Sequence, residues 1–429
     1  MRASSSRSTG SMPKRRRLPA ADILFVHANF PAQFRNHAAL LTDDDRFRVF
    51  AVGGPTARPL RGVRLRRYQM PRQETRAHPF ARRLDGEATR AEEVMYALIA
   101  LKGEGVSPRI IFAHPGWGET LPIKAVFPDA KLILYCEYFY RPTGSDADFD
   151  AEVAHFGVDG RIRIAMKNAS TLLALEQADG GISPTAWQRS TFPPEWQHKI
   201  RVLHEGIDTA RLDTQDVMSP FAQKIRALAR GGPILTFVSR SLEPYRGFHS
   251  FMRALPAIQA GAPDAHVFLV GRDAVSYGTP PEGARSWKEA MLRELGGRLD
   301  LERIHFLGNL DYPDYLALLG LSDLHTYLTY PFVLSWSLIE ALALGCLVLA
   351  SDTEPVREVM EHGRNGILVP FFEPRTLANK ALDVLADPGR FQPMRERARR
   401  EARQHFDWDR AIRPSFARMM DEFVAPELY

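Results

Sequence analysis

Short, almost uninterrupted apolar runs recur along the chain and are separated by stretches with helical spacing. Such runs cover residues 22–27, 47–54, 109–116, 131–137, 233–240, 265–272, 303–310, 323–330 and 346–351. Strands that are apolar on both faces are typical of parallel sheets covered by helices on each side. The sequence therefore predicts an α/β protein.

The series of strands occurs twice, and the 429 residues exceed the size at which a single core keeps growing. The break falls in the polar, Gly-rich segment 208–233. We expect two Rossmann-like domains facing each other across a cleft, the first over 20–212 and the second over 213–400. Residues 401–429 are predicted to be helical and to pack back on the first domain. Ligands of open α/β sheets bind at the carboxyl ends of strands, so the cleft is the expected site.

The net charge of +5 is concentrated at the N-terminus. Residues 1–19 hold six basic residues and no acidic one, which leaves −1 on the rest of the chain. This segment is predicted to be a disordered basic tail. A neutral body without a recognition motif argues against a nucleic-acid partner, and no apolar run reaches the length of a membrane span. Cys136 and Cys346 are expected to be buried free thiols, which favours a cytoplasmic location.

The stretch "LSWSLIEALALG" at 334–345 has the features of a turn into a helix. Ser335 or Ser337 is suited to the N-cap, Ser337 and Glu340 fit a capping box, and Gly345 is a plausible C-terminal stop. The same helix start is also suited to a diphosphate, because its backbone N–H groups are free and its dipole is positive. Capping and anion binding both remain open for this stretch.

A second candidate element is "SRSLEPYRGF" at 239–248. Arg240 ends a predicted strand, and Arg246 with Gly247 opens the next helix at the same edge of the sheet. Two guanidinium groups at one cleft form a clamp for a pyrophosphate. The alternative for each arginine is a surface ion pair.

These motifs together resemble glycosyltransferase family 4, a group of retaining enzymes with the GT-B fold that use nucleotide-sugar donors. The resemblance is carried over 233–372 by "VSRSLEPYRGF", "FLVGRD", "RIHFLGNL", "SLIEALALGCLVLAS" and "VREVMEHGRNGILVP". The first half agrees more loosely, through "HANFPAQFR", "AHPGWGE", "GISPTAWQ" and "HEGIDTARL".

The resemblance implies a role for each candidate residue on the donor side. Arg240 and Arg246 would hold the diphosphate, and Glu340 would accept hydrogen bonds from the ribose. His114 would face the donor sugar, although a loop histidine without a role is the alternative. The remaining residues implied for the donor are the backbone of Ser335, Trp336 and Ser337 at the distal phosphate, and Gly271, Arg272, Asn309 and Leu310 at the nucleobase.

One position departs from the family pattern. A glutamate usually stands eight residues before the one that matches Glu340, and here that residue is Phe332. The backbone or another carboxylate such as Glu137 or Glu354 takes over its role, or the role is absent.

The acceptor is expected on the first domain. His27, Asn29 and Gln33 follow the first strand and are able to hydrogen-bond a hydroxylated acceptor, and Glu137 ends a neighbouring strand. Phe30 and Phe34, in the same stretch, are expected in the core.

Two further features have alternative interpretations. Asp146 and Asp148 have the spacing of a metal site in sugar transferases, but they lie in a loop, so a solvated loop is favoured and neither a metal nor a cofactor is expected. Ten arginines in 57–90 would attract an anionic acceptor or an anionic membrane surface, or form a solvated face.

The function predicted is a retaining, metal-independent transfer of a sugar from a nucleotide sugar to a glycan, lipid-linked or small-molecule acceptor. The alternative is a non-catalytic GT-B subunit that binds a nucleotide or a partner, and a third candidate is a nucleotide-sugar epimerase. A dehydrogenase is disfavoured, because no Gly-x-Gly-x-x-Gly follows the first strand.

Overall fold

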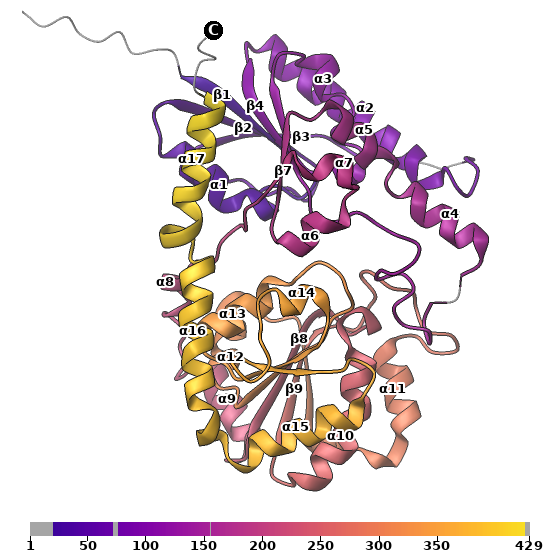
Figure 1. Cartoon of the computed structure of the whole chain (residues 1–429), viewed down its shortest axis with the longest axis vertical. Coiled ribbons are helices and arrows are strands. Elements are labelled where there is room, and N and C mark those ends of the chain that lie inside the picture. The colour runs from indigo at the N-terminus through magenta and orange to yellow at the C-terminus, as the bar shows by residue number, and fades with distance from the viewer. Residues whose placement is uncertain (1–19, 72–75, 155, 425–429) are drawn as a thin grey trace, which may run out of the picture.

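The computed structural model describes residues 20–71, 76–154 and 156–424. The basic segment 1–19, with its predicted disorder, lies outside the described residues, as does 425–429. Within the described part, two wholly parallel sheets of seven and six strands form separate layered domains, one above the other in Figure 1. The predicted α/β class and the two Rossmann-like domains are confirmed.

Both sheets have the doubly wound strand order. The first reads β3 (Val63–Arg67), β2 (Phe47–Gly53), β1 (Ala21–Val26), β4 (Pro108–Ala113), β5 (Lys131–Tyr135), β6 (Gly180–Ser183) and β7 (Ile200–Val202). The second reads β10 (Ile304–Gly308), β9 (His266–Arg272), β8 (Ile234–Ser241), β11 (Leu324–Tyr327), β12 (Val348–Ser351) and β13 (Ile367–Val369). The order reverses between β1 and β4 and between β8 and β11, and these switch points are where such sheets bind ligands.

Helices cover both faces of the first sheet. One core joins inward residues of β1 and β4 to α1 (Arg35–Thr42) and α17 (Arg413–Val424). The opposite core joins the alternate residues of the same strands to α2 (Arg82–Gly103), α3 (Ile123–Val126) and α5 (Ala169–Gln177). The remaining helices of this domain are α4 (Val158–Met166), α6 (Ala186–Thr191) and α7 (Pro194–Gln197).

The second sheet is covered in the same way. On one face lie α10 (Phe248–Gly261), α11 (Trp287–Leu295) and α15 (Pro374–Ala386). On the other lie α9 (Pro220–Ala229), α12 (Tyr312–Gly320), α13 (Trp336–Leu344) and α16 (Gln392–Phe406). The short helices α8 (Thr209–Leu212) and α14 (Glu354–Arg357) lie near the junction of the domains.

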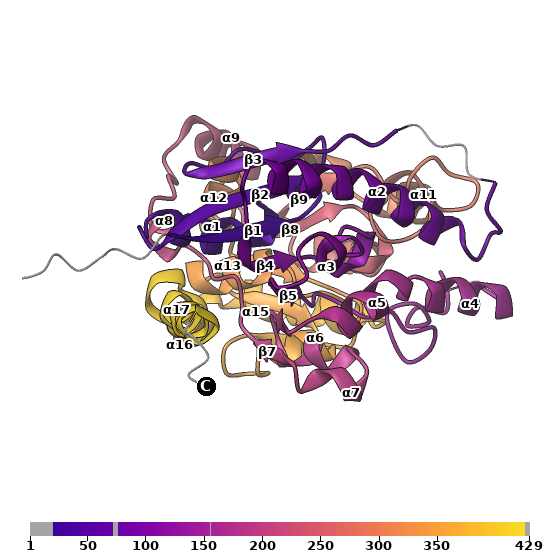
Figure 2. The ribbon, with the colours of Figure 1, turned by 90° about the horizontal axis from the view of Figure 1, so that it is seen from above.

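The last two helices connect the domains from outside. Figure 1 shows α16 and α17, in yellow, running along the second and then the first domain, and Figure 2 shows both on one side of the molecule. Phe416 of α17 is fully buried against the first sheet, which contributes roughly 1.5–3 kcal/mol. The chain passes between the domains near residue 207 and again near residue 407, and these two segments lie side by side. The Ile207 N–H donates to the Phe406 carbonyl and the Trp408 N–H donates to the Ile207 carbonyl, both at 2.8 Å.

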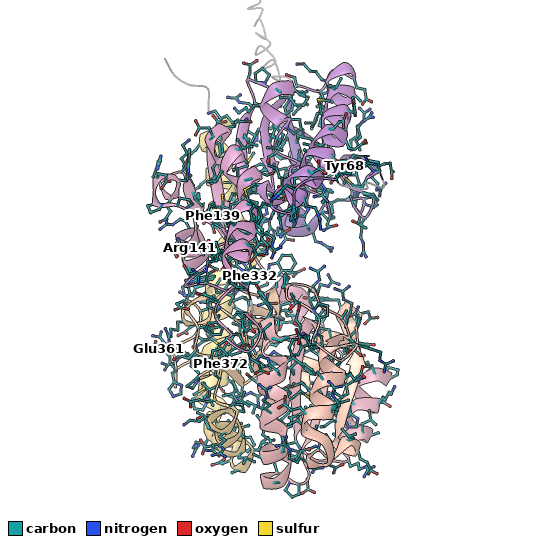
Figure 3. The ribbon with its side chains drawn as sticks, turned by 90° about the vertical axis from the view of Figure 1, so that its right-hand side faces the viewer. Tyr68, Phe139, Arg141, Phe332, Glu361 and Phe372 are labelled. Carbon is teal, nitrogen blue, oxygen red and sulfur yellow. The ribbon has the colours of Figure 1, made fainter. Side chains whose placement is uncertain are left out.

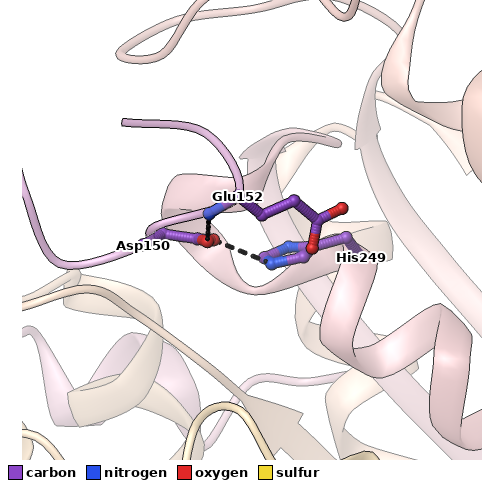
Figure 4. A group of neighbouring side chains, drawn as sticks. All are labelled: Asp150, Glu152 and His249. Atoms are coloured by element: carbon purple, nitrogen blue, oxygen red, sulfur yellow. Dashed lines mark hydrogen bonds and ion pairs between the residues drawn. The ribbon is translucent and has the colours of Figure 1, made fainter. Parts of the chain in front are cut away.

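The loop between β5 and α4 reaches from the first domain into the second. Its Tyr138, Tyr140 and Phe149 pack against the core of the second domain. Asp150 in this loop accepts a hydrogen bond from the Tyr330 hydroxyl at 2.6 Å and lies 3.0 Å from His249 Nε2. Figure 4 shows this contact with Glu152, whose backbone N–H donates to Asp150. The domains are therefore tied together on two sides.

The two cysteines and two phenylalanines that were expected in the interior are buried. Cys136 and Cys346 are buried free thiols as predicted, and burial raises the pKa of both thiols. Phe30 and Phe34 are core residues, also as predicted. Among the described helices, none combines the length and the apolar character needed to cross a membrane.

Candidate functional site

A pocket of about 340 Å³ lies between the carboxyl ends of the two sheets and gathers several predicted residues. The residues that line it are Glu137, Val238, Ser239, Arg240, Arg246, Tyr277, Tyr327, Val333, Leu334, Ser335, Trp336 and Ser337. Its floor is the switch point between β8 and β11, where ligands are expected. Six of the residues singled out from the sequence therefore come together in one place.

Arg246 is a buried cation without an acidic partner. Its Nη1 donates to the Thr329 hydroxyl at 2.7 Å and to the Tyr327 hydroxyl at 3.3 Å. Its guanidinium carbon lies 5.6 Å from the ring centroid of Tyr277 and 5.8 Å from that of Phe332. In the described chain no carboxylate lies within ion-pair distance of Arg246. A buried charge left unpaired is costly, so this guanidinium is suited to an anion that enters the pocket.

Arg240 belongs to the same pocket but is exposed. It lies in β8, one residue before the strand ends, and its side chain forms no hydrogen bond or ion pair with the described residues. Gly247 ends the turn that positions Arg246, with φ of 69°, and a Cβ there would lie 2.2 Å from Leu328. Only glycine is compatible with that turn. Within the part of the chain that the structure describes, neither Arg240 nor Arg246 forms the surface ion pair considered for it.

The helix start at the pocket differs from the capping box that the sequence predicted. Ser335 is the N-cap of α13, and its hydroxyl accepts from the Ser337 N–H at 3.3 Å. The Glu340 carboxylate makes no bond to Ser337, because the helix begins at Trp336 and Glu340 lies two residues beyond the position that a capping box requires. The expected capping box between Ser337 and Glu340 is wrong, whereas Gly345 does end the helix, with φ of 80°.

Glu340 instead bonds to two tyrosines of α12. Its carboxylate oxygens accept from the Tyr312 hydroxyl at 2.7 Å and the Tyr315 hydroxyl at 2.8 Å. Burial raises the pKa of this carboxyl above its ordinary value, although both hydrogen bonds act in the opposite direction. Glu340 lies one helical turn beyond the pocket lining, so its role toward a ribose stays a prediction.

The residues expected at a nucleobase lie at the same edge of the sheet but outside the pocket lining. Gly271 and Arg272 end β9, and the Arg272 Nη2 donates to the Ser276 hydroxyl at 3.3 Å. Asn309 and Leu310 follow β10, the edge strand next to β9. These four residues are neighbours of the pocket, and no contact in the structure tests their role.

On the first domain, a carboxylate and a histidine face each other at the switch point. Glu137 accepts from the Gln33 amide at 2.9 Å and lies 3.4 Å from His114 Nε2. His114 Nδ1 accepts from the Gly116 N–H, so its proton belongs on Nε2, toward Glu137. Burial by itself raises the pKa of Glu137, but the hydrogen bonds from His114 and Gln33 outweigh it, and the pKa lies below its ordinary value. His114, stacked at 4.2 Å on Trp117, is thus a positioned residue rather than a free loop histidine.

The other acceptor-side candidates are more constrained. His27 is buried, its Nδ1 accepts from the Asn29 N–H, and its Nε2 has no partner among the described residues. Burial and the nearby His114 lower the pKa of His27 to about 3, so the ring is neutral at physiological pH. Asn29 is exposed and accepts from the Thr56 hydroxyl at 2.7 Å.

Phe332 lies within a cluster of aromatic rings. The rings of Tyr138, Tyr245 and Tyr277 have their centroids 4.9, 5.4 and 5.0 Å from that of Phe332. Figure 3 shows Phe332 at the junction, with Phe139 and Arg141 on the side of the first domain. Of the carboxylates considered as substitutes for the missing glutamate, Glu137 lines the pocket and Glu354 does not.

The loop with Asp146 and Asp148, predicted to be solvated, is exposed at Asp148 and buried at Asp146. Asp146 is buried and accepts from the hydroxyls of Tyr138 and Tyr245 at 2.9 and 2.7 Å. Asp148 accepts from two backbone N–H groups of its own turn. The expectation is wrong for Asp146, because this carboxylate packs into the junction and accepts from two tyrosines, whereas Asp148 is exposed as predicted.

Asp150, Glu152 and His249 have ligand atoms close enough for a metal ion. However, the Asp150 carboxylate already accepts from the Tyr330 hydroxyl and contacts His249. Arg253 donates two hydrogen bonds to the Glu152 carboxylate, at 2.7 and 2.6 Å. These contacts explain the cluster as a tie between the domains (Figure 4).

A larger cavity of about 760 Å³ lies elsewhere at the junction, beside α14 and α16. Its arginines are already paired, Arg357 with Asp352 and Arg364 with Glu361 and Glu401. Glu358 accepts from the N–H groups at the start of α6. In the described residues, the smaller pocket is therefore better suited to a phosphate.

Five residues that complete the site were not predicted from the sequence. Tyr277, Tyr327 and Thr329 surround Arg246, and Tyr312 and Tyr315 hold Glu340. Tyr327 and Thr329 come at the end of a predicted strand, a position that signals a site. The other three depend on packing between loops and helices far apart in the sequence.

Two family models match the chain in succession. The model described as "Glycosyl transferase family 4 group" matches residues 45–212, and the one described as "Glycosyl transferases group 1" matches 220–405. Among curated proteins, a phosphatidyl-myo-inositol mannosyltransferase of Mycobacterium leprae is 30% identical over 44% of this chain and 46% of its own length. The corresponding protein of Mycolicibacterium smegmatis is 28% identical over 51% and 59%. The chain thus spans about half the length of the curated relatives it matches.

Solved structures share the fold over nearly the whole chain. HepE of Anabaena in complex with UDP-glucose matches with a TM-score of 0.65 and 18% identity, over 94% of this chain and 99% of that chain. Sucrose-phosphate synthase of Thermosynechococcus elongatus matches with a TM-score of 0.67 and 18% identity, over 94% and 98%. At this identity the likeness shows the GT-B fold alone.

Proposed function

We propose, for a chain that belongs to glycosyltransferase family 4, that it transfers a sugar from a nucleotide-diphosphate sugar to a hydroxyl of an acceptor. The observation that carries the proposal is Arg246, a buried guanidinium without a carboxylate, in one pocket with Arg240 and the start of α13. A diphosphate supplies the negative charge that this arrangement lacks.

The donor side is suited to stabilise a leaving group. Cleavage of the sugar–phosphate bond places growing negative charge on the diphosphate. Arg246, which Thr329 and Tyr327 hold in place, stabilises that charge together with Arg240 and a helix N-terminus. Because these groups are part of the chain, we propose that transfer needs no metal ion.

Glu137 is proposed to take over the role that the family gives to a glutamate at position 332. It is ionised, lines the donor pocket from the first domain, and is held by Gln33 and His114. A carboxylate there orients a sugar hydroxyl and stabilises the positive charge that develops on the ring. We propose transfer with retention, in which the departing phosphate accepts the acceptor proton on the same face.

The acceptor is proposed to be a glycan, a lipid-linked molecule or a small polyol bound on the first domain near His27, Asn29 and Gln33. The names of the relatives, which include an inositol-phosphate glycosyltransferase and a glycogen synthase, suggest three test acceptors: inositol phosphate, phosphatidylinositol and an α-glucan. A cytoplasmic location, with peripheral attachment to an anionic membrane, stays part of the proposal.

Several arginines of 57–90 form ion pairs with glutamates of the first domain. These pairs reduce the positive charge that the segment offers to a ligand. Arg64 and Arg66 pair with Glu104, and Arg83 pairs with Glu87. Arg58 and Arg61 are exposed, and the pair offers positive charge to an anionic acceptor or lipid.

The experiment that tests the proposal incubates the protein with UDP-, GDP-, ADP- and TDP-sugars and each test acceptor, with EDTA present. Release of nucleoside diphosphate that depends on an acceptor supports transfer, and the anomeric configuration of the product, measured by NMR, tests retention. A nucleotide that binds without any turnover would favour the non-catalytic alternative. Release of free sugar and nucleotide without an acceptor would favour an epimerase.

A further inference from the structure

The loop after β9 brings Tyr277 into the wall of the donor pocket, and a buried carboxylate holds it there. Glu243, between β8 and α10, is fully buried. Its carboxylate accepts from the backbone N–H groups of Ser276, Tyr277 and Gly278 at 3.0 to 3.2 Å. The Ser241 and Ser276 hydroxyls are also bonded, at 2.6 Å. Three N–H groups converge on one carboxylate, and such bonds are stronger than those to a neutral acceptor.

The Arg272 Nη2 also donates to the Ser276 hydroxyl at 3.3 Å, and two more bonds lie farther along the loop, from Trp287 Nε1 to the Thr279 carbonyl and from Arg293 to the Gly283 carbonyl. Residues 273–286 form no helix or strand, so the bonds to Glu243 and Ser241 fix the end of the loop that meets the pocket. Glu243 has no direct part in the proposed sugar transfer, because its carboxylate is enclosed and does not line the pocket.

Tyr277 links this loop to the clamp. Its ring centroid lies 5.6 Å from the guanidinium carbon of Arg246 and 5.0 Å from the ring centroid of Phe332. The side chain is 38% exposed and lines the pocket. An aromatic face beside a desolvated guanidinium attracts it, so the position of the ring helps to set the position of the cation.

We infer that Glu243 is a positioning residue that acts through Tyr277. By fixing the N–H groups of residues 276–278, it holds the Tyr277 ring against Arg246 and completes the wall that a nucleoside diphosphate contacts. The inference rests on the proposed function, since it gives Tyr277 a part in donor binding.

The test combines Glu243→Gln, Tyr277→Ala, Tyr277→Phe and the double variant E243Q/Y277A. Glu282→Gln, an exposed residue of the same loop, is the matched control. Hydrogen exchange reports on the backbone at 276–278, and calorimetric titration with UDP, GDP and ADP gives Kd. We expect E243Q to speed exchange at 276–278 and, like Y277A, to raise the Kd of the tightest nucleotide roughly tenfold. E282Q should match the wild type, and Y277F, which keeps the ring, should lose less affinity than Y277A.

The double variant separates positioning from general damage. If Glu243 acts through Tyr277, E243Q/Y277A binds no more weakly than Y277A alone; additive losses would overturn the inference. Unchanged exchange and affinity in E243Q would also overturn it. If E243Q does not fold, equal losses in Y277F and Y277A would refute the role of the ring beside Arg246. If the wild type and E282Q bind none of the three nucleotides, the proposed function itself fails and this inference with it.

Discussion

Replacing Arg246 by methionine should separate activity from stability. Methionine approximately keeps the volume of the buried stem and removes the charge. The folded protein no longer holds a buried guanidinium without a carboxylate, which favours folding. The Thr329 and Tyr327 hydroxyls lose their donor, at about 1 kcal/mol for each bond. The two effects oppose each other, so we expect the free energy of unfolding to stay within about 2 kcal/mol of the wild type.

Activity should fall much further. The loss of one preorganised donor to a developing charge costs about 2.7–4 kcal/mol, which corresponds to roughly a 100- to 1000-fold lower kcat. The assay measures nucleoside diphosphate released from the preferred donor, beside urea unfolding of the same samples. Arg253→Met is the matched control: it removes the pairs with Glu152 and Glu294 away from the pocket and should change only stability. A kcat of Arg246→Met within about threefold of the wild type would refute the clamp.

Three further outcomes are expected. Glu340→Ala should weaken nucleotide binding by roughly tenfold in calorimetry, through loss of the predicted ribose contact; a lower melting temperature with unchanged affinity would make Glu340 a structural acceptor for Tyr312 and Tyr315. Burial raises the pKa of the Glu205 carboxyl to about 7. Between about pH 4.5 and pH 7 this carboxyl is therefore protonated in the folded state and ionised in the unfolded state. The free energy of unfolding falls as the pH rises through this range. Glu205→Gln should therefore be more stable than the wild type above pH 7, by about 2–4 kcal/mol, and lose this advantage toward pH 4 in urea unfolding; equal curves would contradict the buried carboxyl. Removal of divalent ions with EDTA should leave turnover unchanged, and loss of activity that Mg²⁺ restores would contradict the metal-independent mechanism.

The fold was predictable where the strands are apolar and central. The runs that form β1, β2, β4, β5 and β8 to β12 are apolar enough to be recognised in the sequence. The strands that were missed lie toward the edges: β3 is the arginine-rich "VRLRR", and β6, β7 and β13 are only three or four residues long. Such strands carry a weak signal because they bury little side-chain surface and depend on a neighbour already in place.

The candidate site was predictable where it follows from topology. Arg240, Arg246 and Ser335 meet because the carboxyl ends of parallel strands share one edge. The contacts of Glu340 could not be predicted in this way. A capping box requires the helix to begin at Leu338, but it begins at Trp336, and Glu340 bonds with Tyr312 and Tyr315 instead of capping the helix. The aromatic contacts of Phe332 and Tyr277 also lay beyond the sequence, since they form only when loops from both domains pack together.

The proposed function depends on the binding of a nucleoside diphosphate in the pocket with Arg240 and Arg246. The most direct measurement is calorimetric titration of the wild type and of the double variant R240M/R246M with UDP, GDP, ADP and TDP, in the presence of EDTA. One nucleotide is expected to bind the wild type without a metal ion, and the double variant, still folded, is expected to lose this binding. Absence of binding to the wild type, or equal affinity in the double variant, would contradict it.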